Sequence, residues 1–238
     1  MPGYSSVWFD VFARTIPEPQ TRREVDFLAK FLPPPGFHRL LDVACGTGRH
    51  ARELGRRGYA VRGVELDESL VAENRARGDA QVEYAAGDMR DLAAAAPGRP
   101  FDAVLCLWQS LFGFEDATNE RVFHGLVSRA REGGRLLLDL YHRGFFEHRL
   151  GERAFDRDGV RGVERKSMDG DRLTVRLEYA QRPDVVDTYT WRVFEPEELA
   201  RYAGSFGLSL VAACSEFDAT SRPTPDRPRM QLVFAKGE

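Results

Sequence analysis

The sequence predicts an α/β fold built on a mostly parallel sheet, and three observations carry that prediction. Between about residues 21 and 141, strand-like and helix-like stretches alternate, as expected for βαβ units with right-handed crossovers. A buried strand at 40–44 runs into a loop with two glycines that opens a helix. After residue 150 the alternation gives way to successive strands joined by short turns.

The elements of the alternating part follow from apolar spacing and from start and stop signals. Thr21-Arg22-Arg23-Glu24 matches a capping box, so the first helix is expected to begin there and to end before Pro33. Residues 117–131 form the clearest amphipathic pattern, which Glu132-Gly133-Gly134 should end. The expected strands are 40–44, 59–66, 82–86, 101–107 and 135–141, and the other expected helices are 49–57 and 67–77.

The remainder of the chain predicts an antiparallel insertion and a return to the sheet. Three strands are expected after residue 150, then a helix that begins at Pro196, and finally two strands. The strands are 159–167, 172–181, 185–194, 208–214 and 230–235. We expect one domain over 1–238, with an N-terminal helical lid (1–36), a cofactor-binding core (37–150), a β-rich insertion (151–194) and a C-terminal part of the core sheet (195–238).

Composition excludes several classes of protein. The 34 basic and 37 acidic residues give a formal charge of −3, which argues against an obligate nucleic-acid binder. All but three of the basic residues are Arg, spread along the chain, and we interpret this bias as genomic. Three distant cysteines favour a reducing cytoplasm over a disulfide framework, and no metal is expected. The first residues do not match the pattern of a signal peptide, and no apolar run reaches membrane-spanning length, so we expect neither a signal peptide nor a membrane partner.

The glycine loop after the first strand is the strongest functional signal. Gly46-Thr47-Gly48 lets a ligand approach the backbone at the carboxyl end of that strand. The loop also formally matches the dinucleotide pattern G-x-G-x-x-A. However, Asp42 lies in the strand just before it, and a carboxylate there suits a cationic ligand better than a pyrophosphate.

Two further carboxylates follow the next two strands. Glu65 ends the second strand, where an acidic residue can accept ribose hydroxyls. Asp88 follows the third strand, where its carboxylate can accept the exocyclic N–H of an adenine. Together with Asp42, they favour S-adenosylmethionine over a nicotinamide cofactor.

The three carboxylates, in this order and spacing, resemble the pattern of the class I S-adenosylmethionine-dependent methyltransferases. The resemblance is close over about residues 40–141, and the tail resembles a subgroup of small bacterial small-molecule methyltransferases with a β-rich insertion. The segments that carry it are DVACGTGRHARELGRRGYAVRGVELDESL, VEYAAGDMRDL, FDAVLCLW and REGGRLLLDLY. The family implies a Rossmann-like, seven-stranded sheet of order 3-2-1-4-5-7-6, helices on both faces and an antiparallel strand 7, here 230–235.

The resemblance also implies where the ligands bind. Cofactor-binding residues are expected in the N-terminal lid, in the glycine loop and after strands 2, 3 and 4: Tyr4, Arg14, Asp42, Ala44, Cys45, Gly46, Thr47, Gly48, Glu65, Leu66, Gly87, Asp88, Met89, Leu107 and Trp108. Substrate-binding residues are expected in the lid and after strands 4 and 5: Trp8, Phe9, Gln109, Ser110, Phe112 and Arg143. The aromatic lid residues could also form an ordinary packing face.

The catalytic candidates are Tyr141 and His142 after the fifth strand. His142 is the best candidate for a general base, because histidine is the residue type that changes charge near neutral pH, although a loop histidine with a structural hydrogen bond is the slightly favoured alternative. Methyl transfer needs mainly proximity and orientation.

We therefore expect a cytoplasmic enzyme that transfers a methyl group from S-adenosylmethionine to a nitrogen or oxygen of a small molecule, yielding S-adenosyl-L-homocysteine. The family suggests specialised metabolism. The alternatives are an O-methyltransferase with His142 as base, a non-catalytic S-adenosylmethionine-binding protein and an NAD-dependent oxidoreductase. The insertion is expected either to wall the pocket or to form a homodimer surface.

Overall fold

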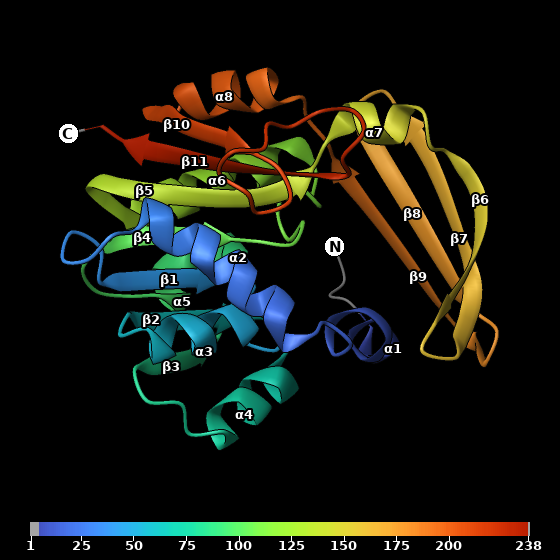
Figure 1. Cartoon of the computed structure of the whole chain (residues 1–238), viewed down its shortest axis with the longest axis horizontal. Helices are drawn as coiled ribbons and strands as arrows, with labels where there is room; N and C mark the ends of the chain where they lie inside the picture. The colour runs from blue at the N-terminus through green and yellow to red at the C-terminus, as the bar shows by residue number, and fades with distance from the viewer. Residues whose placement is uncertain (1–4, 238) are drawn as a thin grey trace.

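The computed structural model describes residues 5–237, which form a seven-stranded sheet between two helical layers and a separate four-stranded sheet (Figure 1). The large sheet has the order β10-β11-β5-β4-β1-β2-β3. Read from the other edge, this is the predicted order 3-2-1-4-5-7-6, with β11 as the predicted strand 7 and β10 as strand 6. All neighbours are parallel except β11, which runs antiparallel to β5 and β10. The strands are β1 (Arg39–Val43), β2 (Ala60–Glu65), β3 (Val82–Ala86), β4 (Phe101–Cys106), β5 (Ala130–Tyr141), β10 (Leu208–Cys214) and β11 (Arg229–Lys236).

Each face of the large sheet is covered by its own helices. On one face α5 (Leu92–Ala95), α6 (Asp116–Arg129) and α8 (Pro196–Gly204) share a core with the strands. On the other, α2 (Glu18–Phe31), α3 (Arg49–Arg56) and α4 (Glu68–Ala76) form a second core. Because successive strand side chains alternate, Leu41 belongs to the first core and Leu40 to the second. The sheet is therefore buried on both sides, as parallel sheets require.

The insertion forms the second sheet, of order β6-β7-β8-β9 and antiparallel throughout. Figure 1 shows it standing beside the carboxyl ends of the core strands, with the N-terminal helices between the two sheets. Its strands are β6 (Gly151–Arg157), β7 (Val160–Asp169), β8 (Arg172–Tyr179) and β9 (Arg182–Arg192), and α7 (Arg143–Glu147) leads into it. The N-terminal segment comprises α1 (Ser6–Trp8) and a π-helical turn, η1 (Phe9–Ala13), and the short 3₁₀ helix η2 (Met89–Asp91) follows β3.

The predicted starts of two elements were wrong. The first long helix begins at Glu18 after Pro17, not at a capping box, and Thr21 and Glu24 are buried within it. β5 begins at Ala130 rather than at 135, because a register shift between Phe101 and Ala103 accommodates Gly133, whose φ is +68°.

The first strand of the insertion, β6, was not predicted. Six of its seven residues are exposed, so it lacks the alternation of apolar and polar residues that identifies a half-buried strand.

Within residues 5–237, no helix is both long enough and apolar enough to cross a membrane.

Candidate active site

A cavity of about 370 Å³ opens at the carboxyl ends of β1 to β4. The strand order reverses between β4 and β1, and open α/β sheets bind ligands at such a point. The walls come from the N-terminal segment, from the loops after these strands and from the start of α3. They comprise Trp8, Phe9, Ala13, Ile16, Asp42, Ala44, Cys45, Gly46, Thr47, Arg49, His50, Val64, Glu65, Leu66, Asp67, Gly87, Asp88, Met89, Arg90, Leu107, Trp108, Ser110 and Phe114.

The glycine loop needs its glycines for backbone shape and for packing. Gly46 and Gly48 have φ values of +54° and +70°, a region that favours glycine. A Cβ at Gly48 would lie 2.8 Å from the Tyr84 hydroxyl oxygen. Gly48 itself does not line the cavity, but it lets the loop pack on β3 and turn into α3.

Asp42 is a buried carboxylate with an unused acceptor. Its side chain lines the cavity and is 2% exposed. Its Oδ2 atom has no hydrogen-bond partner within the described residues. Burial raises the pKa of Asp42 to about 7, and the neighbouring Glu65 adds to the shift while Arg49 opposes it. A cationic donor placed in the cavity would satisfy this oxygen and favour its ionised form.

Glu65 is oriented by three backbone N–H groups. Its Oε1 accepts from Leu66 N at 2.8 Å and Asp67 N at 3.1 Å, and its Oε2 accepts from Gly46 N at 2.8 Å. A carboxylate has about four acceptor positions. Oε2 therefore keeps one position for a ligand hydroxyl at the cavity wall.

Asp88 is held by its neighbour Arg90. Oδ1 accepts from Arg90 N at 2.8 Å and Oδ2 from Arg90 Nε at 2.8 Å. This side-chain hydrogen bonding lowers the pKa of Asp88. The carboxylate is therefore an ionised acceptor, and an adenine N–H there would share it with the guanidinium.

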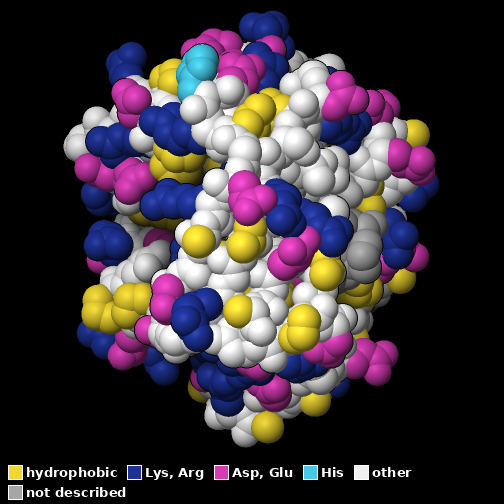
Figure 2. All heavy atoms as spheres, turned by 90° about the vertical axis from the view of Figure 1, so that its right-hand side faces the viewer, with side chains coloured by type: hydrophobic (Ala, Val, Ile, Leu, Met, Phe, Trp, Pro, Cys, Tyr) yellow, Lys and Arg dark blue, Asp and Glu magenta, His cyan; other side chains and the backbone are white. Residues whose placement is uncertain are grey.

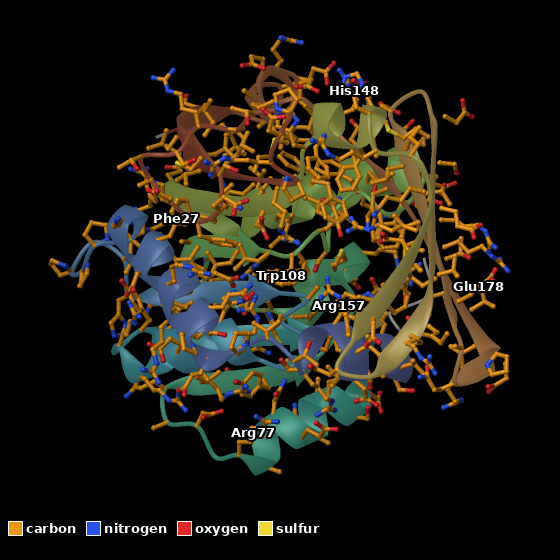
Figure 3. The ribbon with its side chains drawn as sticks, turned by 45° about the vertical axis from the view of Figure 1, so that its right-hand side comes forward. Phe27, Arg77, Trp108, His148, Arg157 and Glu178 are labelled. Atoms are coloured by element: carbon orange, nitrogen blue, oxygen red, sulfur yellow. The ribbon has the colours of Figure 1, made fainter. Side chains whose placement is uncertain are left out.

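The wall after β4 has an uncommon backbone. Trp108, Gln109 and Phe112 have φ values of +58°, +56° and +66°, which non-glycine residues adopt only when the surroundings impose them. Asp139 imposes part of this shape, because its Oδ2 accepts from Trp108 N at 2.9 Å and its carbonyl from Gln109 N at 2.9 Å. Figure 3 labels Trp108 near the centre of the molecule, beside α2.

Asp139 is itself fixed by β11. It is 0% exposed, and its carboxylate accepts from the guanidinium of Arg229 and from Gln231 Nε2, the latter at 2.8 Å. The Arg229 guanidinium also lies 4.5 Å from the centre of the Trp108 ring, a cation–π distance. The strained loop is therefore held by a buried charge pair between β5 and β11.

A second buried carboxylate, Glu24 of α2, supports three cavity residues from behind. It lies 2.6 Å from His50 Nε2, 2.6 Å from Arg49 Nη2 and 3.2 Å from Trp108 Nε1. Burial raises the pKa of Glu24, but the hydrogen bond with His50 and the nearby positive charge outweigh burial and lower it to about 2. Burial and Arg49 lower the pKa of His50. At neutral pH we therefore assign an ionised Glu24 that accepts a hydrogen bond from the Nε2–H group of neutral His50.

The structure brings most of the predicted cofactor residues and three predicted substrate residues to one cavity. Trp8, Phe9 and Ser110 lie in its wall with the carboxylates and the glycine loop. Tyr4 lies outside the described residues.

Several predicted residues lie outside the cavity lining. Arg14 pairs with Asp10 and Glu73, each at 3.0 Å. Gln109 is buried and accepts from Tyr141 N, and Phe112 stacks against Phe123 in the core.

The two predicted catalytic residues and Arg143 also lie outside this lining. His142 is 2% exposed and its Nε2 lies 3.6 Å from Glu195. Arg143 pairs with Glu198 at 2.8 Å. The Tyr141 ring packs against Phe146 and Trp191. These residues join the core to the insertion.

Sequence reasoning did not select Glu24, Arg49 or Arg90 as site residues. Arg49 directly follows the glycine loop, so its position at the start of α3 was an available signal. Glu24 gave no such signal, because its role depends on α2 packing against α3.

We predict that Asp42→Asn makes stability less sensitive to pH. A folded pKa of about 7 lies above the unfolded value of about 3.9. The native protein therefore retains this proton above pH 4, and stability falls as pH rises towards 7. The free energy of unfolding of Asp42→Asn, minus that of the native protein, should therefore rise by about 3 kcal/mol between pH 5 and pH 8. Urea unfolding at both pH values measures it, with Asp226→Asn, an exposed site, as control. Parallel curves for the native protein and Asp42→Asn would refute the assignment.

We predict that Glu24→Ala lowers the free energy of unfolding by about 3–5 kcal/mol, because it leaves Arg49 buried without its partner. Glu18→Ala is the matched control on α2: its carboxylate is 60% exposed in pairs with Arg22 and Arg56, so it should cost less than about 1 kcal/mol. The Glu24 contribution should be complete above about pH 4.3 and lost towards pH 2. Equal losses for the two variants, measured by chemical unfolding at pH 7, would contradict this role.

Comparison with known proteins agrees with this geometry. Residues 40–134 match the family model described as a methyltransferase domain. A dTDP-3-amino-3,6-dideoxy-alpha-D-glucopyranose N,N-dimethyltransferase of Streptomyces fradiae is 45% identical over 73 residues, which are 30% of this chain and 27% of that protein. The chain spans between 27% and 58% of the length of curated relatives such as this one.

Solved structures extend the likeness in fold to the whole chain. An S-adenosylmethionine-dependent methyltransferase from Clostridium acetobutylicum superimposes with a TM-score of 0.79 at 17% identity, over 98% of this chain and 97% of the other. An amino pentose methyltransferase from Micromonospora echinaspora, solved with S-adenosylmethionine bound, gives 0.69 at 23% identity over 99% of both. The chain therefore contains a methyltransferase domain at residues 40–134, in the fold of the class I S-adenosylmethionine-dependent methyltransferases.

Proposed function

We propose that this protein transfers a methyl group from S-adenosylmethionine to an amine nitrogen of a small molecule. The observation that carries the proposal is the row of three carboxylates, Asp42, Glu65 and Asp88, at the ends of three neighbouring strands in one cavity. The orphaned Asp42 oxygen fits the ammonium group of the cofactor, and Glu65 and Asp88 fit its ribose and adenine. When bound, the cofactor supplies an electrophilic methyl group on its sulfonium sulfur.

The residues of the chain contribute binding, orientation and exclusion of water. Trp8, Phe9 and Trp108 give the cavity aromatic walls, and aromatic faces stabilise a nearby cation. Holding the acceptor in line with the methyl group can supply roughly 7–11 kcal/mol of the barrier.

An amine acceptor fits the described lining, because its carboxylates Asp42, Glu65 and Asp88 are assigned to the cofactor and Asp67 caps α4. The one imidazole there belongs to His50, whose Nε2 is engaged with Glu24. A neutral amine attacks with its own lone pair and releases a proton only after transfer. A hydroxyl acceptor would need deprotonation, and His142 lies outside the lining.

The relatives support the acceptor class. The Streptomyces fradiae protein is named for an amino sugar and the Micromonospora echinaspora protein for an amino pentose. We therefore propose an amino sugar or a similar small amine, in specialised metabolism, as the acceptor of this chain.

We predict that the protein binds S-adenosylhomocysteine and that Glu65→Ala weakens binding by about 1–3 kcal/mol, through lost hydrogen bonds. Isothermal titration calorimetry measures the affinity. Glu83→Ala is the matched control, because this exposed carboxylate on β3 pairs with Arg62 outside the cavity. Binding of NAD without S-adenosylhomocysteine would instead indicate an oxidoreductase.

We predict that the protein transfers the methyl group to a dTDP-linked 3-amino sugar and not to its 3-hydroxy analogue. Mass spectrometry of the products measures this. His142→Ala should keep the rate per folded molecule within about twofold, because the imidazole lies outside the cavity lining. Methylation of the hydroxy analogue alone, with loss of activity in His142→Ala, would favour the O-methyltransferase alternative.

A further inference from the structure

The inserted sheet has one apolar face, and that face covers the N-terminal segment. Buried side chains at alternate positions of β8 and β9 form it. They are Leu173, Val175, Leu177, Tyr179, Tyr189 and Trp191, and they pack with Val7, Trp8, Val11 and Phe12. Arg157, the last residue of β6, is labelled beside the N-terminal helices in Figure 3, and its guanidinium lies 4.8 Å from the centre of the Phe12 ring.

The opposite face of the sheet is polar. Figure 2, which views the molecule from the side of the insertion, shows basic and acidic side chains interspersed. Arg165, for example, pairs with Glu152 at 2.8 Å and with Glu178 at 2.7 Å. The apolar face of the insertion is therefore already used within the chain, by the N-terminal segment.

Asp187 is the exception on the apolar face. It points inward from β9 and is 7% exposed. Its Oδ2 accepts from the Tyr179 hydroxyl at 2.7 Å and from the Ser5 hydroxyl at 2.7 Å. Ser5 N also donates to the Tyr189 hydroxyl at 3.4 Å. A buried carboxylate is costly unless it is hydrogen-bonded, and here it meets the first described residue of the chain.

Ser5 links Asp187 to the residues that line the cavity. Its Oγ accepts from Trp8 N at 3.0 Å and so caps α1. Since the single hydroxyl proton goes to Asp187, the oxygen lone pairs remain available for Trp8 N. Trp8, whose N–H is bound by the cap, and the next residue, Phe9, line the cavity, and Phe9 lies against Gly46.

The segment depends on such external contacts. α1 has three residues and η1 has five, far fewer than an isolated helix needs to be stable in water. Its position must therefore come from its cap and from packing on the inserted sheet.

We propose that Asp187 is a positioning residue that, through the Ser5 hydroxyl, holds Trp8 and Phe9 over the cofactor cavity. The inserted sheet thereby controls how fast the cofactor product leaves. This inference rests on the proposed function of the cavity, because it requires the cavity to bind S-adenosylhomocysteine.

The test is a double-mutant cycle on Ser5 and Asp187, read as the dissociation rate of S-adenosylhomocysteine in stopped-flow experiments. Ser5→Ala leaves the sheet intact and should raise the rate about tenfold, as expected for a lost hydrogen bond to a charged group. Asp187→Asn should have a smaller effect, because its amide oxygen still accepts. The double variant should match Ser5→Ala, since both changes act on the same contact and Ser5→Ala already removes it.

Asp184→Asn is the matched control, because this exposed carboxylate on β9 pairs with Arg182. Hydrogen exchange should show lost protection in residues 5–16 and unchanged protection in 40–134. Unchanged dissociation in Ser5→Ala, or effects that add in the double variant, would overturn the inference. If the native protein does not bind S-adenosylhomocysteine at all, the proposed function fails, and this outcome is distinct from the other two.

Discussion

The buried pair between Asp139 and Arg229 is the interaction on which the site depends. Asp139 lies on β5 near the carboxyl end of that strand, and Arg229 begins β11, 90 residues later in the chain. The pair fixes the backbone of Trp108 after β4 and so joins three strands at the edge where the cavity opens. Removing either partner would leave the other charge buried without compensation, so the shape of this wall requires both.

The same principle recurs at the other walls. Glu24 on α2 supports Arg49, His50 and Trp108, and Asp187 on β9 supports the cap of α1. In each case a carboxylate behind the wall orients residues that line it. The cavity is thus built from segments far apart in the chain, and its geometry depends on buried polar contacts that are satisfied only when all of them have folded.

Much of the fold was predictable because its signals are local. Alternating strands and helices, the glycine loop and the turns of the insertion are read from neighbouring residues, and the sheet order followed from the family resemblance. The failures have physical causes. The capping box at Thr21 was a chance match inside a helix that begins at Glu18, and β6 has no buried face to give it a pattern.

For the site, the sequence by itself determined the positions of the three carboxylates and the glycine loop, because each lies at or just after the carboxyl end of a strand, and parallel strands end at one edge of the sheet. Only the tertiary structure decided the rest. It placed Arg14 and His142 outside the cavity lining and brought Glu24 and Asp187 behind the walls. Such roles depend on which helices and sheets pack together across tens of residues, and no local spacing encodes that contact.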